Sequence, residues 1–143
     1  MIFVSKCFDE LSLKELYEII KSRTSVFLLE QNIVCQDLDD IDYLALHCFF
    51  KEDNKVTAYL RAYKSDETTV KIGRVLTLEH KKGLGIKLME KAFGEIEKHF
   101  EYSKICVHAQ KQAEGFYAKM GFETVSNEFF EEGVPHVVME MKK

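Results

Sequence analysis

Hydrophobic and polar positions along the first third of the chain predict a strand, two helices and a loop. Residues 1–8 predict the strand. Ser12 then begins a helix, because Ser12 and Glu15 form a capping box in which each side chain satisfies a free backbone amide at that helix end. A second short helix is predicted from Thr24 to Glu30, and the acidic run Asp37-Leu-Asp-Asp-Ile-Asp42 predicts a loop.

The middle of the chain predicts a hairpin and one further strand. The hairpin strands span 43–51 and 55–63, and they flank Asp53-Asn54, which is typical of a tight turn. After a polar turn, residues 69–78 predict another strand.

The second half contains the clearest helical pattern, which Gly83-Leu-Gly85 opens. Apolar residues recur there every four positions and therefore lie along one helix face; they are Leu84, Leu88, Ala92, Ile96 and Phe100. A strand is predicted at 104–108, and a short helix at 112–119 that ends before Gly121, a helix C′ glycine. Two closing strands are predicted at 124–130 and 134–141.

This order of elements predicts the fold class. It is an α/β fold, in which one domain over residues 1–143 holds a central mixed, mostly antiparallel sheet flanked by about four helices.

Composition and charge exclude several classes of protein. The balance of 46% hydrophobic and 31% charged residues is that of an ordinary globular domain. The net charge is -4 and the lysines are scattered, apart from Lys81-Lys82, which excludes nucleic acid as a partner. Neither a signal peptide nor a bilayer-spanning apolar run is present, so we expect a cytoplasmic protein without a membrane partner. The four cysteines match no zinc pattern, and we expect reduced, partly buried thiols and no metal.

The junction His80-Lys81-Lys82-Gly83-Leu84-Gly85 has the features of an anion site. A helix N-terminus offers unpaired backbone N–H groups and the positive end of the helix dipole. Glycines let the backbone approach a pyrophosphate closely, and the two lysines add positive charge. Alone, this motif also fits a flexible connection, and it matches neither a Walker loop nor a Rossmann fingerprint.

A second motif, Phe116-Tyr117-Ala-Lys-Met-Gly121-Phe122, follows farther along the chain. Together the two motifs resemble the GNAT acetyltransferase family. The glycine loop of that family reads Arg or Gln, two residues, Gly, one residue, then Gly or Ala. Its second signature reads Asn, then Ala three residues on, then an aromatic-Tyr pair that ends in Gly-Phe. In this chain Gln110 and Ala113 stand at the first two positions of the second signature.

Within the family, the chain resembles the ElaA-like acetyltransferases over nearly its whole length. The matching segments are Arg23-Thr-Ser-Val26-Phe27-Leu-Leu-Glu30-Gln31; Asp37, Asp39 and Asp42 with His47; Ile72-Gly73-Arg74-Val75; and Glu132-Gly133-Val134-Pro135-His136 with Met139. Three positions depart from the family pattern. His80 replaces Arg or Gln, Cys35 replaces Tyr, and Gln110 replaces Asn.

The resemblance implies an N-acetyltransferase that moves an acetyl group from acetyl-CoA to a primary amine of a small molecule or peptide. The amine attacks the thioester directly, and CoA is a product. Val75, Leu76 and Thr77 are then expected to pair with the pantetheine arm as an added strand would. The expected pyrophosphate site comprises Lys82, Gly83, Leu84, Gly85, Ile86 and Lys87, and Gln110 is a further cofactor contact.

The resemblance also implies roles in catalysis and acceptor binding. Tyr117 is the expected general acid to the CoA thiolate; the alternative is a core aromatic beside Phe116. Many GNAT enzymes use a Glu on the strand before the glycine loop as the general base, and this strand lacks one there. The base stays open among Glu30, His47, His136 and a water chain. The expected substrate-binding residues are Glu30, His47, Arg74 and His136.

Each candidate base also has a structural interpretation. Glu30 fits a surface position on a short helix, His47 a buried and hydrogen-bonded strand position, and His136 a polar-face strand position.

The acidic loop permits two further interpretations. Asp37 and Asp39 fit the first ligand spacings of an EF-hand, but Asp42 stands where the invariant glycine belongs, which excludes a calcium loop. We expect the loop to line the amine site or to pair with Arg23, Arg61 or Arg74, the alternative being a solvated charge run.

Two alternatives to an enzyme remain open. One is a non-catalytic acyl-CoA-binding module that acts through a partner. The other is a structural protein with a decayed site, against which the intact Gly83 and Gly85 argue. The chain is expected to be a monomer or homodimer.

Overall fold

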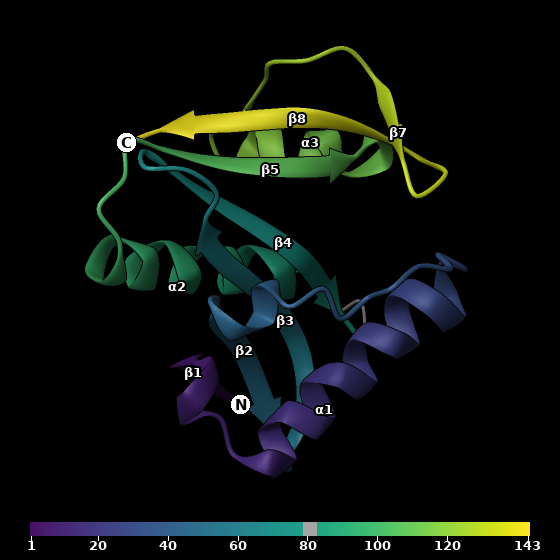
Figure 1. The fold of residues 1–143 in the computed structure, drawn as a ribbon, viewed down its shortest axis with the longest axis vertical. Coiled ribbons are helices and arrows are strands. Elements are labelled where there is room, and N and C mark those ends of the chain that lie inside the picture. Colours follow the sequence, from purple (N-terminus) through teal and green to yellow (C-terminus); the bar gives the residue numbers. More distant parts are fainter. Residues whose placement is uncertain (79–82) are drawn as a thin grey trace.

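A computed structural model describes residues 1–78 and 83–143, which form one mixed sheet covered by helices (Figure 1). Within these residues the sheet has eight strands in the order β1-β2-β3-β4-β5-β8-β6, and β7 also pairs with β8. Only β4 and β5 are parallel. The strands are β1 Ile2–Cys7, β2 Leu46–Glu52, β3 Lys55–Lys64, β4 Thr69–Thr77, β5 Lys104–Gln110, β6 Glu123–Thr124, β7 Phe129–Glu131 and β8 Val134–Lys142. This confirms the predicted fold class.

The helical elements follow the predicted order. They are α1 Leu13–Arg23, the π-helical segment η2 Thr24–Glu30, α2 Leu84–His99 and α3 Glu114–Lys119, with 3-10 turns η1 Phe8–Glu10, η3 Ile41–Tyr43 and η4 Lys111–Ala113. The capping box is confirmed, because Glu15 N donates to Ser12 Oγ over 3.0 Å and Ser12 N donates to Glu15 Oε1 over 2.9 Å. Segment η2 continues α1 without a break, since Thr24 keeps a right-handed helical backbone.

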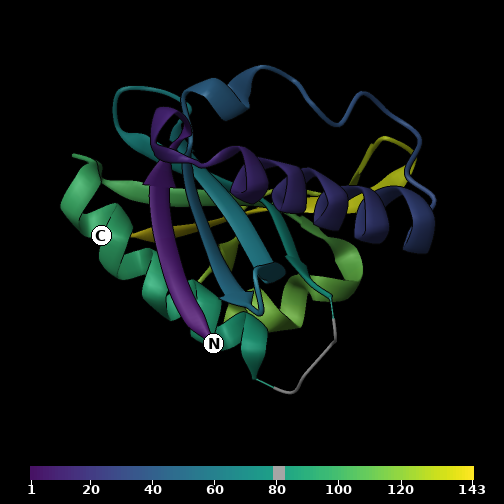
Figure 2. The ribbon, with the colours of Figure 1, turned by 90° about the horizontal axis from the view of Figure 1, so that it is seen from below.

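Helices cover both faces of the sheet, and Figure 2 shows α1 and α2 on opposite sides of the first strands. Side chains of a strand point alternately to its two faces. Accordingly, Leu60 packs in the core beneath α2, whereas its neighbour Tyr59 packs beneath α1 with Ile19. The larger core includes the predicted apolar stripe of α2, of which Leu88 is fully buried.

The sheet divides between β4 and β5. Their parallel pairing joins residues 69–72 to residues 104–107 and goes no farther, although both strands continue. In the same region the register between β4 and β3 shifts near Arg61, and Arg74 has a positive φ of 54°. Such a bulge bends a strand and increases its twist. Beyond Ile72, β4 therefore turns away from β5 (Figure 1).

Several predicted boundaries differ from the structure, and three of the differences have a visible cause. The predicted strand 124–130 is wrong, because Ser126 Oγ accepts from Val138 N over 2.8 Å and takes the place of a ladder bond, so that β6 and β7 are separate short strands. Strand β2 begins at Leu46 because Leu44 N donates to Ile41 O over 2.9 Å and closes a 3-10 turn. The predicted helix 112–119 begins with the 3-10 turn η4.

The predicted turns and thiols can also be compared with the structure. The tight turn at Asp53-Asn54 is confirmed, with φ values of 51° and 63° that suit a hairpin turn. Gly121 has a φ of 105°, as a C′ glycine requires. No disulfide joins the cysteines: Cys48 and Cys106 are buried, whereas Cys7 and Cys35 are exposed.

Candidate active site

A cavity of about 330 Å³ lies where β4 and β5 separate. Both strands line it, together with η2, the loop that follows η2, and the hairpin of β7 and β8. Residues far apart in the sequence, such as Phe27, Tyr63 and Gln112, therefore line the same cavity. The cavity opens on the face of the sheet that α1 and η2 cover.

The cavity brings together five of the residues predicted to bind the cofactor or the acceptor or to act in catalysis. Val75 and Arg74 come from β4, Gln110 from β5, Tyr117 from α3 and His136 from β8. The Gln110 amide nitrogen donates to Gln31 Oε1 over 2.9 Å, and so joins β5 to the loop after η2 across the cavity. Cys35, one of the departures from the family pattern, also lines it.

Two of the predicted substrate-binding residues lie outside this cavity. His47 is 1% exposed; its Nδ1 lies 2.7 Å from Tyr59 Oη and its Nε2 lies 2.9 Å from the backbone oxygen of Asp42. Both ring nitrogens are therefore engaged, as the structural interpretation of His47 expected. Glu30 is exposed at the end of η2 and does not line the cavity.

Helix α2 starts beside the same gap with a glycine in the left-handed conformation. Gly83 is its N-cap with a φ of 83°, and Lys87 N donates to Gly83 O over 3.1 Å. Next to it, a Cβ on Gly85 would lie 3.3 Å from two ring atoms of Phe116, so α2 and α3 pack closely there. In this first turn Leu84 is buried, whereas Ile86 and Lys87 are exposed. His80 and Lys82 lie outside the described residues.

The β4 residues nearest α2 show a partly exposed edge. Leu76 and Thr77 pair with β3 on one side, and no described strand pairs with them on the β5 side. Their backbone groups on that side are consequently available to an added extended segment.

Tyr117 is a buried aromatic that also borders the cavity. Its ring packs edge-to-face on Phe116 and Phe122, with centroids 5.1 Å and 5.7 Å away. It is 7% exposed, and burial raises the pKa of its hydroxyl well above the usual value. The hydroxyl therefore stays protonated at neutral pH. Tyr117 is part of the core and also lines the cavity, so its location is compatible with a core aromatic and with a general acid.

The acidic loop pairs with arginines from three elements, as expected. Arg74 Nε donates to Asp37 Oδ1 over 2.8 Å at the cavity wall. Asp37 also accepts from Arg23 Nε over 2.9 Å, and Asp39 accepts from Arg61 Nη2 over 2.6 Å. Burial acts to raise the pKa of Asp39, but the bonds and charge of Arg61 outweigh it and hold the pKa at about 2. The loop is thus fixed against the sheet by ion pairs.

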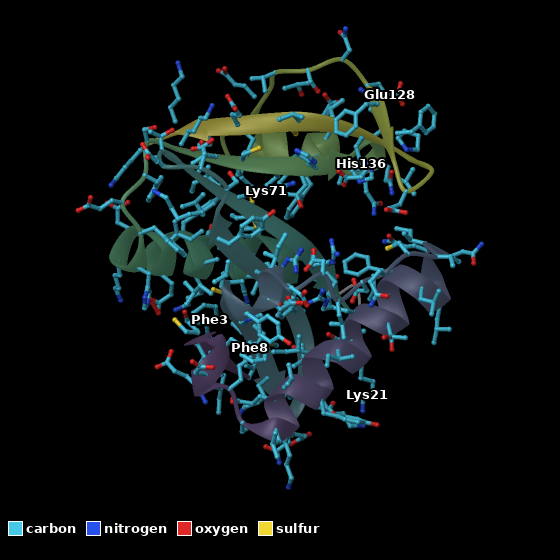
Figure 3. All side chains as sticks on the ribbon, in the orientation of Figure 1. Phe3, Phe8, Lys21, Lys71, Glu128 and His136 are labelled. Carbon is cyan, nitrogen blue, oxygen red and sulfur yellow. The ribbon has the colours of Figure 1, made fainter. Side chains whose placement is uncertain are left out.

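A second charged cluster lies on the opposite wall, and the sequence identifies only His136 in it. Glu131 Oε1 lies 2.9 Å from His108 Nδ1, and Glu131 Oε2 lies 3.7 Å from His136 Nε2. Lys71 Nζ approaches His108 Nδ1 to 3.3 Å. Figure 3 shows Lys71 and His136 on the cavity side of β4 and β8. Burial acts to raise the pKa of Glu131, but the hydrogen bond and charge of His108 outweigh it and lower the pKa.

The sequence analysis did not identify Lys71, His108 or Glu131 as site residues, because the sequence contains only a weak signal for them. His108 and Gln110 alternate along one strand and so share a face, but only the pairing of Gln110 with His136 shows that β8 adds to the same wall.

Among residues 1–78 and 83–143, no group of three or more His, Cys, Asp or Glu is placed to hold a metal ion. No helix in this part of the chain has the length and apolar character needed to cross a membrane.

The chain is similar to known proteins over most of its length. Residues 36–143 match the model of the acetyltransferase (GNAT) domain. The chain is 34% identical to protein ElaA of Escherichia coli over 137 residues, which cover 92% of this chain and 90% of ElaA. The crystal structure of Escherichia coli ElaA superimposes with a TM-score of 0.93, at 29% identity and with 99% and 100% of the two chains covered.

Two further structures share the fold. An acyl-CoA N-acyltransferase from Pseudomonas aeruginosa superimposes with a TM-score of 0.92 and 32% identity, over 99% of each chain. A GNAT family acetyltransferase from Elizabethkingia anophelis, whose structure has acetyl-CoA bound, shares the fold at a TM-score of 0.64 and 15% identity, over 99% of this chain and 97% of that one. By its matching domain model, its relatives and its fold, this chain belongs to the GNAT acetyltransferase family, where it is similar to the ElaA proteins.

Proposed function

We propose that the chain is an N-acetyltransferase that moves an acetyl group from acetyl-CoA to a primary amine of a small molecule or peptide. The observation that carries the proposal is the divided sheet. Where β4 leaves β5, its residues Arg74 and Val75 line the charged cavity, and Thr77 lies beside the first turn of the glycine-capped helix α2. Family membership supports acyl transfer from an acyl-CoA in general, and the Elizabethkingia anophelis relative holds acetyl-CoA.

The described residues fit the pantetheine and pyrophosphate groups of acetyl-CoA. The free edge of β4 at Val75, Leu76 and Thr77 offers backbone groups with which an extended pantetheine arm can form strand-like hydrogen bonds. The 16-residue helix α2 presents its positive end at Gly83, where a Cβ would meet nothing within 4 Å, so a ligand has room to approach the backbone there. In the proposal the first turn holds the pyrophosphate through Gly83, Leu84, Gly85, Ile86 and Lys87, with Lys82 as a further contact and Gln110 facing the arm.

Tyr117 is the proposed general acid. Its hydroxyl is protonated at neutral pH and borders the gap from the α3 side. A group of this kind can give a proton to the CoA thiolate as the carbon–sulfur bond breaks. Backbone N–H groups of the free β4 edge are suited to stabilise the oxyanion of the attacked thioester.

The acceptor amine enters the cavity from the face that α1 and η2 cover. Arg74 and His136 are the proposed acceptor contacts, because both line the cavity on opposite walls. Glu30 and His47 are left out of the proposed acceptor site, since they lie outside the cavity. Direct attack needs the amine beside the thioester. In the proposal the amine and the thioester meet at this one cavity, which provides that proximity.

A thermal-shift titration with acetyl-CoA and with CoA tests the proposal first. A ligand that binds only the folded state raises the melting temperature. We expect a concentration-dependent rise in the wild type that is lost in Gly83→Glu. Since Gly83 has a positive φ, a second variant, Lys87→Glu, changes the same helix end at an exposed position. Gly94→Glu, in open space farther along α2, is the matched control that keeps the rise.

Turnover is then measured as CoA release, resolved by chromatography, from a panel of primary amines comprising amino acids, polyamines, aminoglycosides and short peptides. Release with at least one amine is expected. Absence of any melting shift in a folded sample would overturn the proposal. Tight CoA binding without turnover for any amine would favour the alternative, a non-catalytic acyl-CoA-binding module acting through a partner.

A further inference from the structure

Two histidines in the cavity wall share one carboxylate. Glu131 on β7 places Oε1 at 2.9 Å from Nδ1 of His108 on β5, and Oε2 at 3.7 Å from Nε2 of His136 on β8. All three line the cavity, and Lys71 of β4 completes the cluster at 3.3 Å from His108 Nδ1. The roles proposed above use neither Glu131 nor His108.

The hydrogen bond of His136 to the backbone determines its tautomer. Nδ1 lies 2.7 Å from the backbone oxygen of Val134. A carbonyl oxygen can only accept, so Nδ1 carries the proton of the neutral ring. The lone pair is then on Nε2, the atom that lies nearer to Glu131. The ring also stacks on Phe129 at a centroid distance of 6.0 Å, which holds its plane.

The other two imidazoles near the cavity are less suited to take up that proton. His47 has both nitrogens engaged and lies outside the cavity. His108 Nδ1 contacts both Glu131 and Lys71, so a proton taken up by this ring would add positive charge beside the Lys71 ammonium, which disfavours it. A separation of 3.7 Å is too long for a hydrogen bond, so His136 Nε2 has its lone pair available within the described part of the cavity.

We propose that His136 Nε2 is the general base that takes a proton from the acceptor amine, and that Glu131 is a positioning residue held in place by His108. This inference rests on the proposed function. The neutral amine, having released one proton to solvent, forms a nitrogen–carbon bond to the thioester carbonyl carbon. His136 takes the proton that the amine nitrogen loses, the carbon–sulfur bond breaks, and Tyr117 gives its proton to the thiolate. The proton on His136 then returns to Tyr117 through solvent, which balances the reaction.

Charge supports this assignment. Glu131 adjoins the nitrogen that becomes positive and stabilises the imidazolium, since an opposite charge within about 4–6 Å favours the charged form. Tyr117 packs in the larger core beneath α2 and also lines the cavity, where His136 lies as well, so both the acid and the base border the same space. The charged and titratable groups that line the cavity with His136 include Glu131 and Glu132 of its own hairpin, His108 and Lys71 of the neighbouring strands, and Arg61, Arg74 and Asp37 of the remaining wall.

The test compares kcat/KM against pH, using acetyl-CoA and whichever panel amine gives the highest turnover. In His136→Asn the new amide keeps a donor near Val134 O but has no basic nitrogen. We expect kcat/KM to fall by about 10²-fold. The acid-side decline, which is the decrease of kcat/KM as the pH is lowered, should be lost, while the rise in melting temperature with CoA stays unchanged. His99→Asn, on the exposed end of α2, is the matched histidine control and keeps wild-type turnover.

Glu131→Gln separates a positioning role from a purely structural one. Loss of the negative charge makes the imidazolium less stable, so the acid-side decline should move to lower pH while the CoA thermal shift is kept. A lower rate with the decline at its original pH would overturn the assigned role of Glu131.

Two results would overturn the base assignment without touching the proposed function. One is wild-type turnover and an unchanged pH profile in His136→Asn that still binds CoA. The other is a nitrogen-15 NMR spectrum of neutral His136 with its proton on Nε2, which decides the matter even where no panel amine is turned over. Failure of the wild type to bind CoA would instead overturn the proposed function.

Discussion

Arg23 Nη1 donates to Asp42 Oδ1 over 2.6 Å and joins the end of α1 to the turn η3. Both residues are buried, at 1% and 7% exposure. Asp42 Oδ1 also accepts from Arg61 over 3.0 Å, and Arg23 passes the network on to Asp37 and thereby to Arg74 at the cavity. The ion pairs that hold the acidic loop therefore also hold one wall of the cavity.

Removal of Asp42 should strongly destabilise the fold. Asp42→Ala removes the carboxylate that the buried guanidinium groups of Arg23 and Arg61 share. Loss of one partner of a buried pair costs about 3–5 kcal/mol, and we expect the lower end of that range because Asp37 and Asp39 still pair with the two arginines. Urea unfolding measures this fall in the free energy of unfolding. Glu95→Ala, which removes the surface pairs with Lys98 and His99, each at 4.0 Å, should cost less than about 1 kcal/mol. Equal effects of the two substitutions would contradict the prediction.

Stability should depend on pH through Glu15. Burial acts to raise the pKa of Glu15, but the Ser12 amide, Lys6 and Lys51 outweigh it and lower the pKa from 4.5 to about 2. Because the pKa is lower in the folded state, the stabilisation is complete above pH 4.5 and is lost as the pH falls toward 2.

Urea midpoints measured between pH 6 and pH 2 check this dependence. Glu15→Gln should lower the midpoint at pH 6 and flatten the acid decline, whereas Glu90→Gln, at an exposed position of α2, should leave both unchanged. An acid decline of full size in Glu15→Gln would show that other carboxylates carry it.

Two glycines of α2 should respond differently to alanine. A Cβ at Gly94 meets nothing within 4 Å, and alanine in an exposed helix interior stabilises by about 0.5–1 kcal/mol over glycine. At Gly85 the Cβ would lie 3.3 Å from the Phe116 ring, so the ring must shift and the gain should be smaller or reversed. Thermal unfolding of Gly94→Ala and Gly85→Ala measures the difference. Equal gains would mean that Phe116 yields without cost.

Tyr117→Phe tests the proposed general acid. The substitution keeps the ring contacts with Phe116 and Phe122 and removes only the hydroxyl. On the proposed function, kcat should fall by about 10²-fold at an unchanged thermal shift with CoA. Tyr17→Phe, 68% exposed on α1, is the control. An unchanged kcat in Tyr117→Phe would leave Tyr117 as a core aromatic only.

Much of the local structure could be predicted from the sequence, because its causes are local. The Ser12–Glu15 capping box, the Asp53-Asn54 turn and the apolar face of α2 depend on residues within one turn of each other, and all three are confirmed. The motifs around Gly83 and Tyr117 were sufficient to identify the GNAT family, since they combine a helix start and an aromatic pair with the right order of elements.

The composition of the cavity was decided by the tertiary structure. Strand periodicity tells which residues share a face, but not which strands become neighbours. The pairing of β5 with β8 places His136 beside Gln110, and the β7–β8 hairpin then brings Glu131 within reach of both His108 and His136. The same limit applies to His47, whose partners Tyr59 and Asp42 come from another strand and a loop. The sequence by itself determined the elements and the family; long-range pairing and the bulge at Arg74 decided which side chains meet where β4 leaves β5.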